Sequence, residues 1–324
     1  MAPRACPWGS MMNLKKSKIL LTGGHGFLGE RVYQELLKAG AILKNIARPR
    51  FKELDFRQPK NCAKAVKGKD LVIHLAANVG GIGYNLKHPG QLFYDNAVMG
   101  INLIEAARKA GVKKFVQVGT VCAYPKVPPH IPFREDDLWQ GYPEETNAPY
   151  GLAKLVLLEM LKAYRREYGF NGIYLLPVNL YGPGDNFDPK SSHVIPALIK
   201  KFIEARQYHH QQIVVWGSGK ASREFLFVDD AARGIVMAAK NYNKADPVNL
   251  GSSFEIKIKD LVAQISRLTG FKGKIIWDKT KPDGQLRRKL DVSRAKREFG
   301  FVSKMNFKQG LIKTLKWYGQ NYEQ

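Results

Sequence analysis

The hydrophobic positions of the chain form short apolar runs that alternate with longer stretches of helical periodicity. Apolar runs of about four to eight residues are typical of strands that a parallel sheet buries on both faces. The runs predict strands at 18–22, 41–46, 71–75, 114–118 and 173–176. The periodic stretches predict helices between the strands, and the longest of these helices cover 89–110 and 150–168. This alternation predicts an α/β fold built on a doubly wound parallel sheet.

The pattern changes beyond Pro177, where the segments become shorter and richer in turn residues. Helical periodicity returns at 195–205, 230–240, 258–268 and 307–318. We expect a Rossmann-type domain over 18–177, to which the chain partly returns later, and a smaller C-terminal α/β lobe over 178–324. Residues 1–17 show no apolar periodicity and are predicted to be a disordered extension.

Composition narrows the partners that this chain can have. Its 324 residues carry a formal net charge of +24, which favours the binding of anions. No zinc-finger, recognition-helix or RNA-binding signature accompanies the charge, so an anionic small molecule is favoured over nucleic acid. Cys6, Cys62 and Cys122 have neither metal-ligand spacing nor the even number of a disulfide framework, which predicts no metal site and a reducing, cytoplasmic location. No apolar run approaches the roughly 20 residues that span a bilayer, so no membrane partner is expected.

Three glycines follow the first predicted strand and lead into the first predicted helix. Gly23, Gly26 and Gly29 have the spacing of a dinucleotide-binding loop, and the strand and helix on either side give that spacing its meaning. The first glycine permits the tight turn, the second lets the backbone approach a pyrophosphate, and the third lets the helix pack against the strand. The helix N-terminus then points at the anion. The sequence therefore predicts a dinucleotide site.

The end of the second predicted strand indicates which nicotinamide cofactor is used. An NAD site usually has an acidic residue about 20 residues beyond the loop, where it binds the ribose 2′-hydroxyl. Here the first acidic residue is Glu53, and Arg48 and Arg50 precede it. Either arginine can pair with a 2′-phosphate. We therefore favour NADP(H) over NAD(H), with two ordinary arginines on a basic surface as the alternative interpretation.

A tyrosine and a lysine four residues apart begin the second long helix. Residues i and i+4 share one helix face, so Lys154 is expected beside Tyr150. A neighbouring positive charge lowers the pKa of a phenol, which would make Tyr150 a general acid or base near neutral pH. Thr120 follows the fourth predicted strand and can hydrogen-bond a substrate oxygen. A surface Tyr–Lys pair is the alternative, but the order of glycine loop, Thr120 and Tyr150–Lys154 favours a catalytic role.

These motifs resemble the extended short-chain dehydrogenase/reductase family. Further motifs resemble the GDP-L-fucose synthase branch of that family, whose members epimerise carbons 3 and 5 and reduce carbon 4 of GDP-4-keto-6-deoxy-mannose. The motifs are 76–82 (AANVGGI), 119–126 (GTVCAYPK), 179–183 (NLYGP), 185–189 (DNFDP), 192–198 (SHVIPAL), 216–219 (WGSG), 223–226 (REFL) and 281–284 (KPDG). The resemblance implies a bifunctional 3,5-epimerase and NADPH-dependent 4-reductase of a GDP-4-keto-6-deoxy-hexose, giving GDP-L-fucose. It also implies a homodimer formed through the two long helices.

The resemblance assigns roles to individual residues. It implies that Thr120, Tyr150 and Lys154 serve hydride transfer, and that Cys122 and His193 are the base and acid of epimerisation. The residues expected at the cofactor are Gly23, His25, Gly26, Phe27, Leu28, Gly29, Arg48, Arg50, Asp55, Ala76, Ala77, Lys154, Pro177 and His193. Those expected at the substrate are Asn179, Lys201, Trp216, Arg223 and Arg288. Lys201 stands where the family usually has arginine, and Arg288 where it usually has lysine. His25 and His74 are interpreted as structural histidines.

The residue types suit this chemistry. A carbonyl at carbon 4 acidifies the hydrogens on carbons 3 and 5, so inversion there needs a base and a proton donor. A thiol beside cationic groups can act as the base, and an imidazole can act as the donor. An inert buried thiol and a helix-start histidine are the alternative interpretations of Cys122 and His193.

Four other functions are less favoured. A simple 4-epimerase does not need a Cys–His pair, although it can tolerate one. A 4,6-dehydratase needs an acidic pair after Thr120, where Val121 and Cys122 stand. A GDP-mannose 3,5-epimerase shares a cysteine in this loop but lacks the motifs at 185–189 and 192–198. A non-catalytic Rossmann protein that senses the cofactor or binds nucleic acid often loses the tyrosine or the lysine, and this chain has both.

Overall fold

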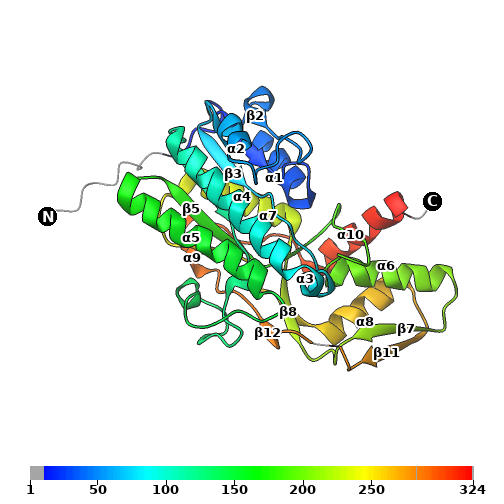
Figure 1. Cartoon of the computed structure of the whole chain (residues 1–324). Coiled ribbons are helices and arrows are strands. Elements are labelled where there is room, and N and C mark those ends of the chain that lie inside the picture. The colour runs from blue at the N-terminus through cyan, green and yellow to red at the C-terminus, as the bar shows by residue number, and fades with distance from the viewer. Residues whose placement is uncertain (1–10, 282, 323–324) are drawn as a thin grey trace.

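The structure is a computed structural model and describes residues 11–281 and 283–322. Its larger lobe is built on a six-stranded sheet in the order β2-β1-β3-β4-β5-β9, in which all neighbouring strands are parallel (Figure 1). The strands are β1 (Ile19–Thr22), β2 (Ile46–Ala47), β3 (Leu71–His74), β4 (Lys114–Val118), β5 (Gly172–Pro177) and β9 (Val248–Leu250). β1, β3, β4 and β5 are buried along their whole length, which explains why their sequences are continuous apolar runs.

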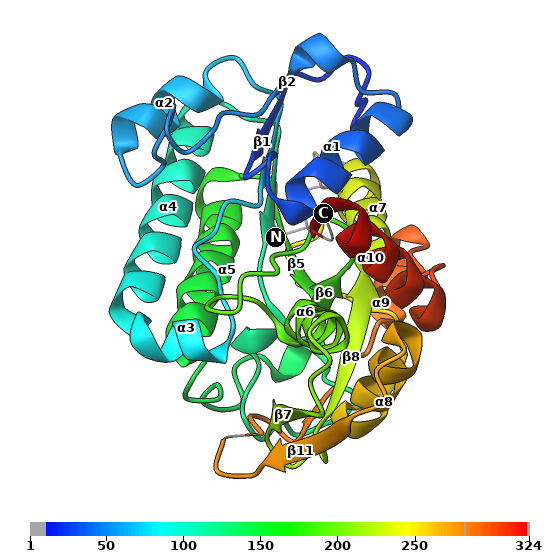
Figure 2. The same ribbon diagram turned by 90° about the vertical axis from the view of Figure 1, so that its right-hand side faces the viewer.

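Helices cover both faces of this sheet, as the edge-on view in Figure 2 shows. One face carries α2 (Pro59–Val66), α4 (Pro89–Lys109) and α5 (Ala148–Tyr168), and the other carries α1 (Phe27–Lys38) and α7 (Val228–Asn241). α4 and α5 pack tightly because Gly100 has no side chain: a Cβ atom there would lie 2.2 Å from Leu157 Cδ1. The predicted doubly wound parallel sheet is thereby confirmed.

The chain returns to the larger lobe twice after β5. α7 and β9 complete the helical layer and the sheet edge, and α9 (Ser293–Phe299) packs beside them. The backbone N–H of Val178 also donates to the carbonyl of Leu250, at 2.9 Å. Each lobe is therefore assembled from segments that are separated in the sequence.

The smaller lobe combines two short sheets with three helices. β8 (Ser222–Phe227) pairs with β6 (Asn179–Tyr181), β10 (Glu255–Lys257) and β12 (Arg287–Arg288), while β7 (Gln212–Trp216) pairs with β11 (Lys274–Asp278). The helices are α6 (Val194–Gln207), α8 (Ile258–Thr269) and α10 (Phe307–Tyr322). Its core is separate from that of the larger lobe and contains Phe202, Phe225 and Phe307.

Two expectations about the N-terminal region were wrong in part. The predicted strand at 41–46 is a 3-10 turn over Leu43–Asn45 followed by the two-residue β2, because Ile42 and Leu43 are exposed and cannot serve as core positions. The predicted extension at 1–17 ends earlier than expected. Residues 1–10 lie outside the described residues, but Leu14 is buried in the larger core and the N–H of Met12 donates to the carbonyl of Lys240.

Candidate active site

A cleft of about 1450 Å³ lies between the two lobes. The loops after β1, β3, β4 and β5 line one side, and α6, β7 and β8 line the other. Ligands of open α/β sheets bind at the carboxyl ends of the strands, which is where these loops meet. Every residue predicted at the cofactor, at the substrate or in catalysis lines this cleft, with the exceptions of Arg48 and Asp55.

The glycine loop has the geometry of an anion cradle. Gly23 has φ +67°, which favours glycine, and a Cβ atom there would lie 2.8 Å from the backbone nitrogen of Ala76. A Cβ atom on Gly29 would lie 2.0 Å from the carbonyl oxygen of Gly23, so the third glycine is what lets α1 start against the loop. No side chain caps the α1 N-terminus at Gly26. Free N–H groups at this helix end fit a phosphate of a dinucleotide.

Arg48 and Arg50 lie in different environments. Arg48 donates to Glu30 Oε2 at 2.8 Å and to the carbonyl of Gly24, and its guanidinium carbon lies 3.4 Å from the centre of the Tyr33 ring. It therefore supports the glycine loop from behind and does not line the cleft, and its assignment to the cofactor stays a prediction. Arg50 lines the cleft together with Lys52, which sequence reasoning missed even though it is the next basic residue along the chain.

Asp55 does not face the cleft either. Both of its carboxylate oxygens accept hydrogen bonds from Arg57, and this pairing lowers the pKa of Asp55. Arg57 also pairs with Asp95 at 3.1 Å, and both Arg57 and Asp95 line the cleft. Arg57, rather than the predicted Asp55, therefore lines the cleft at this position.

Tyr150 and Lys154 share one face of α5, as their spacing predicted. The ammonium nitrogen of Lys154 lies 5.9 Å from the centre of the Tyr150 ring, and burial lowers the pKa of Lys154 to about 8. Burial, with a smaller contribution from Cys122, raises the pKa of Tyr150. The prediction that Lys154 lowers this pKa was therefore wrong, because desolvation of the phenolate is the largest contribution. Tyr150 is consequently a phenol with a proton to donate.

Cys122 is held next to Tyr150 by two local features. Its backbone N–H donates to Thr120 Oγ1 at 3.1 Å, which fixes the short 3-10 helix Val121–Ala123. Gly151 lets α5 approach this loop, since a Cβ atom there would lie 2.4 Å from the carbonyl oxygen of Cys122. The guanidinium of Arg288 reaches the Cys122 sulfur at 3.7 Å. A cation beside a thiol favours the thiolate.

His193 precedes the first turn of α6 and lies inside the cleft, where it remains accessible to solvent. Its surroundings desolvate the imidazole, and this effect and the nearby Arg288 lower the pKa of His193. A neutral imidazole is thus favoured. An anionic substrate beside it acts in the opposite direction and favours the protonated form.

The far side of the cleft is positively charged. Burial, followed by repulsion from Arg288, lowers the pKa of Arg223 to about 9. Arg223 donates to the backbone carbonyl of Asp283, and the Asp283 carboxylate in turn accepts from Ser218. Asp283 lines the cleft and was missed by sequence reasoning, although it belongs to the motif at 281–284. Among the residues that the structure describes, neither guanidinium forms an ion pair with a carboxylate, and two such close cations favour the binding of an anion.

Three other predicted substrate residues also border the cleft. Asn179 donates to the backbone carbonyl of Glu224, and Lys201 donates to the carbonyl of Val214 at 2.6 Å. Trp216 is 57% exposed, so its ring is available for stacking against a planar base. The ammonium of Lys281 lies 5.5 Å from the centre of that ring.

Comparison with known proteins is consistent with this geometry. Residues 19–251 match the model of the NAD dependent epimerase/dehydratase family. The chain belongs to this family. It is 38% identical over 320 residues to the probable GDP-L-fucose synthase 1 of Oryza sativa subsp. japonica, covering 98% of this chain and 96% of that protein. The predicted resemblance to GDP-L-fucose synthases is thereby confirmed.

Solved structures of similar proteins give the same picture for this epimerase/dehydratase-family chain. A GDP-L-fucose synthetase from Naegleria fowleri bound to NADP superposes with a TM-score of 0.84 at 28% identity, covering 97% of both chains. A GDP-6-OMe-4-keto-L-xylo-heptose reductase from C. jejuni superposes with a TM-score of 0.88 at 27% identity, covering 96% of this chain and 99% of that one. These two related enzymes are named for different sugars. The sugar that this chain uses therefore has to be inferred from the residues of its cleft.

Within 11–281 and 283–322, no three His, Cys, Asp or Glu side chains gather closely enough to hold a metal ion. None of the helices in the same ranges is long and apolar enough to cross a membrane.

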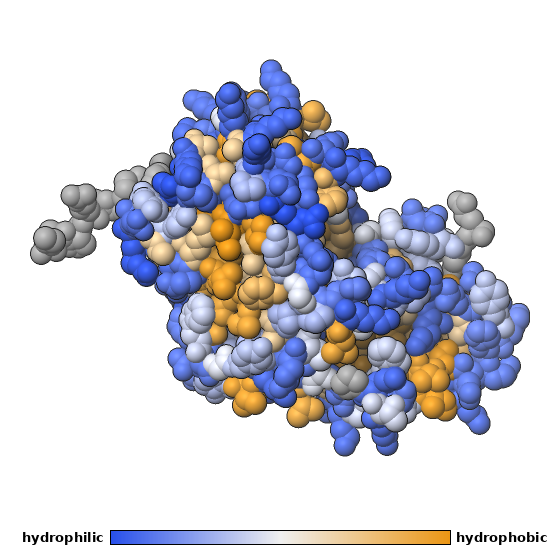
Figure 3. All heavy atoms as spheres, in the orientation of Figure 1, coloured by the Kyte–Doolittle hydropathy of each residue, from blue (hydrophilic) through white to orange (hydrophobic). Residues whose placement is uncertain are grey.

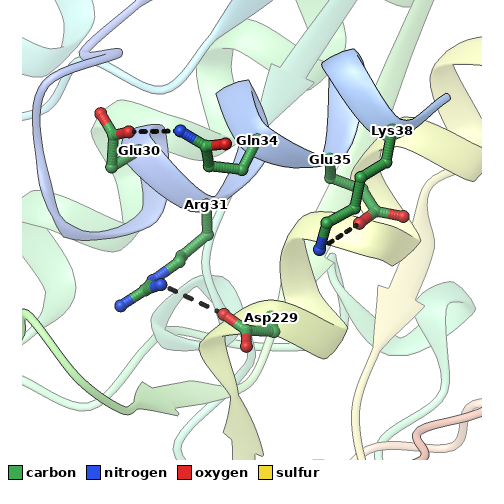
Figure 4. Close-up of a pocket in the computed structure, with 6 residues that line it drawn as sticks. All are labelled: Glu30, Arg31, Gln34, Glu35, Lys38 and Asp229. Carbon is green, nitrogen blue, oxygen red and sulfur yellow. Dashed lines mark hydrogen bonds and ion pairs between the residues drawn. The ribbon is translucent and has the colours of Figure 1, made fainter. Parts of the chain in front are cut away.

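A second, shallower depression of about 370 Å³ lies between α1 and α7 (Figure 4). Its charged side chains pair with one another: Arg31 approaches Asp229 at 3.5 Å, and Lys38 approaches Glu35 at 3.8 Å. Arg31 also donates to the carbonyl of Pro183 at 3.0 Å. These contacts therefore connect α1 to α7, and the depression is not a second binding site.

Asp185 is a buried residue at the edge of the cleft between the two lobes. Its Oδ1 accepts from the N–H of Asn186 at 2.7 Å, and its Oδ2 is buried without a hydrogen-bond partner. Burial raises the pKa of Asp185 from 3.8 to about 7. Ionisation therefore opposes folding: this group favours the folded state most below its unfolded pKa, and that advantage is lost as the pH rises through about 7.

Asp185→Asn is expected to remove this pH dependence. Its free energy of unfolding relative to the unmodified protein should increase by on the order of 3 kcal/mol between pH 5 and pH 8. Urea unfolding at both pH values measures the difference. Asp188→Asn, in the same loop but exposed, is the matched control. An equal loss of stability in Asp185→Asn and the unmodified protein would contradict the assignment of a buried, titrating carboxyl group.

Proposed function

We propose that this protein epimerises carbons 3 and 5 and then reduces carbon 4 of a GDP-4-keto-6-deoxy-hexose with NADPH, giving GDP-L-fucose. One observation carries the proposal: Cys122 and His193 line the same cleft as Tyr150 and Lys154. A simple reductase needs only the second pair, whereas inversion of two carbons next to a carbonyl needs an additional base and acid. The names of the related proteins support the GDP-sugar substrate.

The residues of the larger lobe fit the cofactor. The loop from Gly23 to Gly29 and the N-terminus of α1 bind the pyrophosphate, and Arg50 and Lys52 lie where they can pair with a 2′-phosphate. Bound NADPH supplies the hydride for carbon 4. Tyr150 donates its phenolic proton to the oxygen at carbon 4, and the ammonium of Lys154 stabilises the phenolate that remains. Thr120 donates a hydrogen bond to the same oxygen.

Epimerisation uses the other pair. The Cys122 thiolate, stabilised by Arg288, removes the proton from carbon 3 or carbon 5, and the electron pair stays on the substrate as an enolate. His193 then delivers a proton to the opposite face of that carbon. Arg223 and Arg288 bind the anionic substrate, and Trp216 stacks on its base. Since the enolate is anionic, it also favours the protonated imidazole that the reaction requires.

A second candidate function is reduction without epimerisation, or epimerisation alone, on a different GDP-sugar. The similarity to the C. jejuni heptose reductase supports it. Incubation with GDP-4-keto-6-deoxy-mannose and NADPH, followed by identification of the product by NMR, distinguishes the candidates. GDP-L-fucose supports the proposal. A D-configured product, or an epimerised ketone that is not reduced, would replace it with the second candidate.

The different positions of Arg48 and Arg50 predict different effects on cofactor choice. Arg50→Ala should reduce the preference for NADPH over NADH by roughly 10- to 100-fold, which is what loss of a charged hydrogen bond to phosphate is worth. Arg48→Ala should lower the melting temperature but leave the preference unchanged, because Arg48 supports the loop from behind. The ratio of kcat/KM for the two cofactors measures both. A loss of preference in Arg48→Ala alone would contradict this assignment.

We also propose that the protein forms a homodimer through α4 and α5. Hydrophobic side chains gather over these helices in Figure 3. Phe93, Tyr94, Ile101, Val156 and Tyr168 are between 40% and 57% exposed there. An apolar face of this kind suits a partner surface of the same composition. The cytoplasmic location stays a prediction from cysteine usage.

A further inference from the structure

Asn147 is a cleft residue with no assigned role. It is 9% exposed and stands immediately before the first turn of α5. An asparagine in this position usually caps the helix by accepting a hydrogen bond from a backbone N–H. Asn147 makes no such bond. Its side chain instead contacts Cys122, Asn85 and Glu144.

The orientation of the Asn147 amide follows from its partners. The amide nitrogen donates to Glu144 Oε2, and since an ionised carboxylate can only accept, the nitrogen has to face Glu144. Glu144 is buried and is itself fixed by the backbone N–H and hydroxyl of Thr146. The amide oxygen of Asn147 therefore faces Cys122, with Oδ1 3.7 Å from Sγ. Because this oxygen can only accept, the thiol of Cys122 is the donor.

Cys122 thus lies between two groups with opposite preferences. The amide oxygen of Asn147 stabilises the protonated thiol, whereas the guanidinium of Arg288, also 3.7 Å from the sulfur, stabilises the thiolate. Arg288 is held in turn by Gln285 Oε1 at 3.2 Å. Tyr150 on α5 and Arg223 on β8 also interact electrostatically with Cys122, and Glu144 acts on Arg223.

We propose that Asn147, fixed by Glu144, is the positioning residue that accepts the thiol hydrogen of Cys122 and so sets how readily its sulfur takes up and returns a proton. This inference rests on the proposed function, in which the Cys122 thiolate removes a proton from the substrate. In that step a carbon–hydrogen bond breaks, an S–H bond forms, and the electron pair stays on the enolate. The new S–H donates to Asn147, which stabilises the product of proton abstraction. Arg288 stabilises the thiolate that starts the step.

Alkylation of Cys122 by iodoacetamide tests the inference without substrate. Thiolate is the reactive form, so the pH of half-maximal alkylation, followed by the mass of the peptide that carries Cys122, reports the balance between thiol and thiolate. Asn147→Leu should shift this pH downward by about 0.5 to 1 unit, which is the value of one hydrogen bond. Asn147→Asp keeps an acceptor and adds a negative charge, and it should shift the pH upward. Cys62 does not interfere, because burial raises its pKa to about 12.

Two further variants complete the experiment. Glu144→Gln should shift the alkylation profile in the same direction as Asn147→Leu but less far, and it keeps the inference testable if Asn147→Leu does not fold. Glu145→Gln is the matched control, because Glu145 is the exposed neighbour of Glu144 and pairs with Lys126, and its profile should match the unmodified protein. Binding of NADPH, measured by fluorescence, verifies that each variant is folded.

Opposite shifts in Asn147→Leu and Asn147→Asp support the inference. Unchanged profiles, or shifts in the same direction, would overturn it, since a purely structural asparagine gives no such change of sign. The alkylation profile can be distinguished from a failure of the proposed function, because deuterium exchange in Cys122→Ser tests the role of Cys122 as the base separately. A shifted alkylation profile together with normal exchange in Cys122→Ser would retain the role of Asn147 but remove Cys122 as the base.

Discussion

Tyr150→Phe is expected to abolish most of the reduction while leaving ligand binding close to that of the unmodified protein. Burial raises the pKa of Tyr150, so at neutral pH this residue carries the proton that the oxygen at carbon 4 requires. Phenylalanine keeps the packing of the aromatic ring but has no hydroxyl proton to donate. The rate of NADPH oxidation in single-turnover experiments should fall by roughly 10²–10⁴-fold, the usual contribution of general acid catalysis.

Tyr174→Phe is the matched control for this experiment. Tyr174 is also a buried tyrosine, and its hydroxyl donates to the backbone carbonyl of Lys154 at 2.9 Å, but it does not line the cleft. Its loss should leave the reduction rate close to that of the unmodified protein. If Tyr150→Phe reduces the ketone as fast as Tyr174→Phe, another group protonates the oxygen.

Cys122→Ser should suppress epimerisation and leave reduction intact. A hydroxyl is a far weaker base than a thiol at neutral pH, so exchange of deuterium from heavy water into carbons 3 and 5 should fall by roughly 10²–10⁴-fold. The ketone would then be reduced directly, giving a D-configured deoxyhexose. Tyr150→Phe should show the reverse pattern, with deuterium entering both carbons and little reduced sugar. Mass and proton NMR of the products measure both outcomes.

Two variants extend this experiment. His193→Asn should slow delivery of the second proton and allow a singly inverted sugar to accumulate. Cys62→Ser is the control, because Cys62 is buried in α2 and does not line the cleft. If Cys122→Ser exchanges deuterium as fast as the unmodified protein, Cys122 is not the base, and the proposal of epimerisation loses its main support.

The fold was predictable where burial controls the sequence. The parallel strands at β1, β3, β4 and β5 are continuous apolar runs because both faces of the sheet are covered, and such runs can be recognised without a structure. The second strand was misplaced because β2 is a two-residue strand at the sheet edge whose neighbours Ile42 and Leu43 face solvent. At such a position apolar residues carry no information about register.

The candidate site was predictable as a set of residues but not as a set of contacts. Glycine spacing and the Tyr–Lys pair are local patterns, so the residues they identify reached the cleft. Arg48 and Asp55 did not, because their partners Glu30 and Arg57 are visible only once the side chains are placed. The raised pKa of Tyr150 was missed for a similar reason, since spacing shows the ammonium but not the desolvation. In the sequence, Asn147 cannot be distinguished from an ordinary helix N-cap.

The late return of the chain to the larger sheet determines how this protein can be divided. β9 is the outer strand beside β5, and α7 packs beside α1, yet both β9 and α7 come after residue 177. A fragment that stops at 177 would leave the buried apolar strand β5 as an open edge, ready to pair with another chain and aggregate. The complementary fragment would carry α7 and β9 with no sheet to join. Neither half of the cleft can therefore be produced as an independent module, and chimeras that exchange the substrate side need a junction wherever the chain crosses between the lobes.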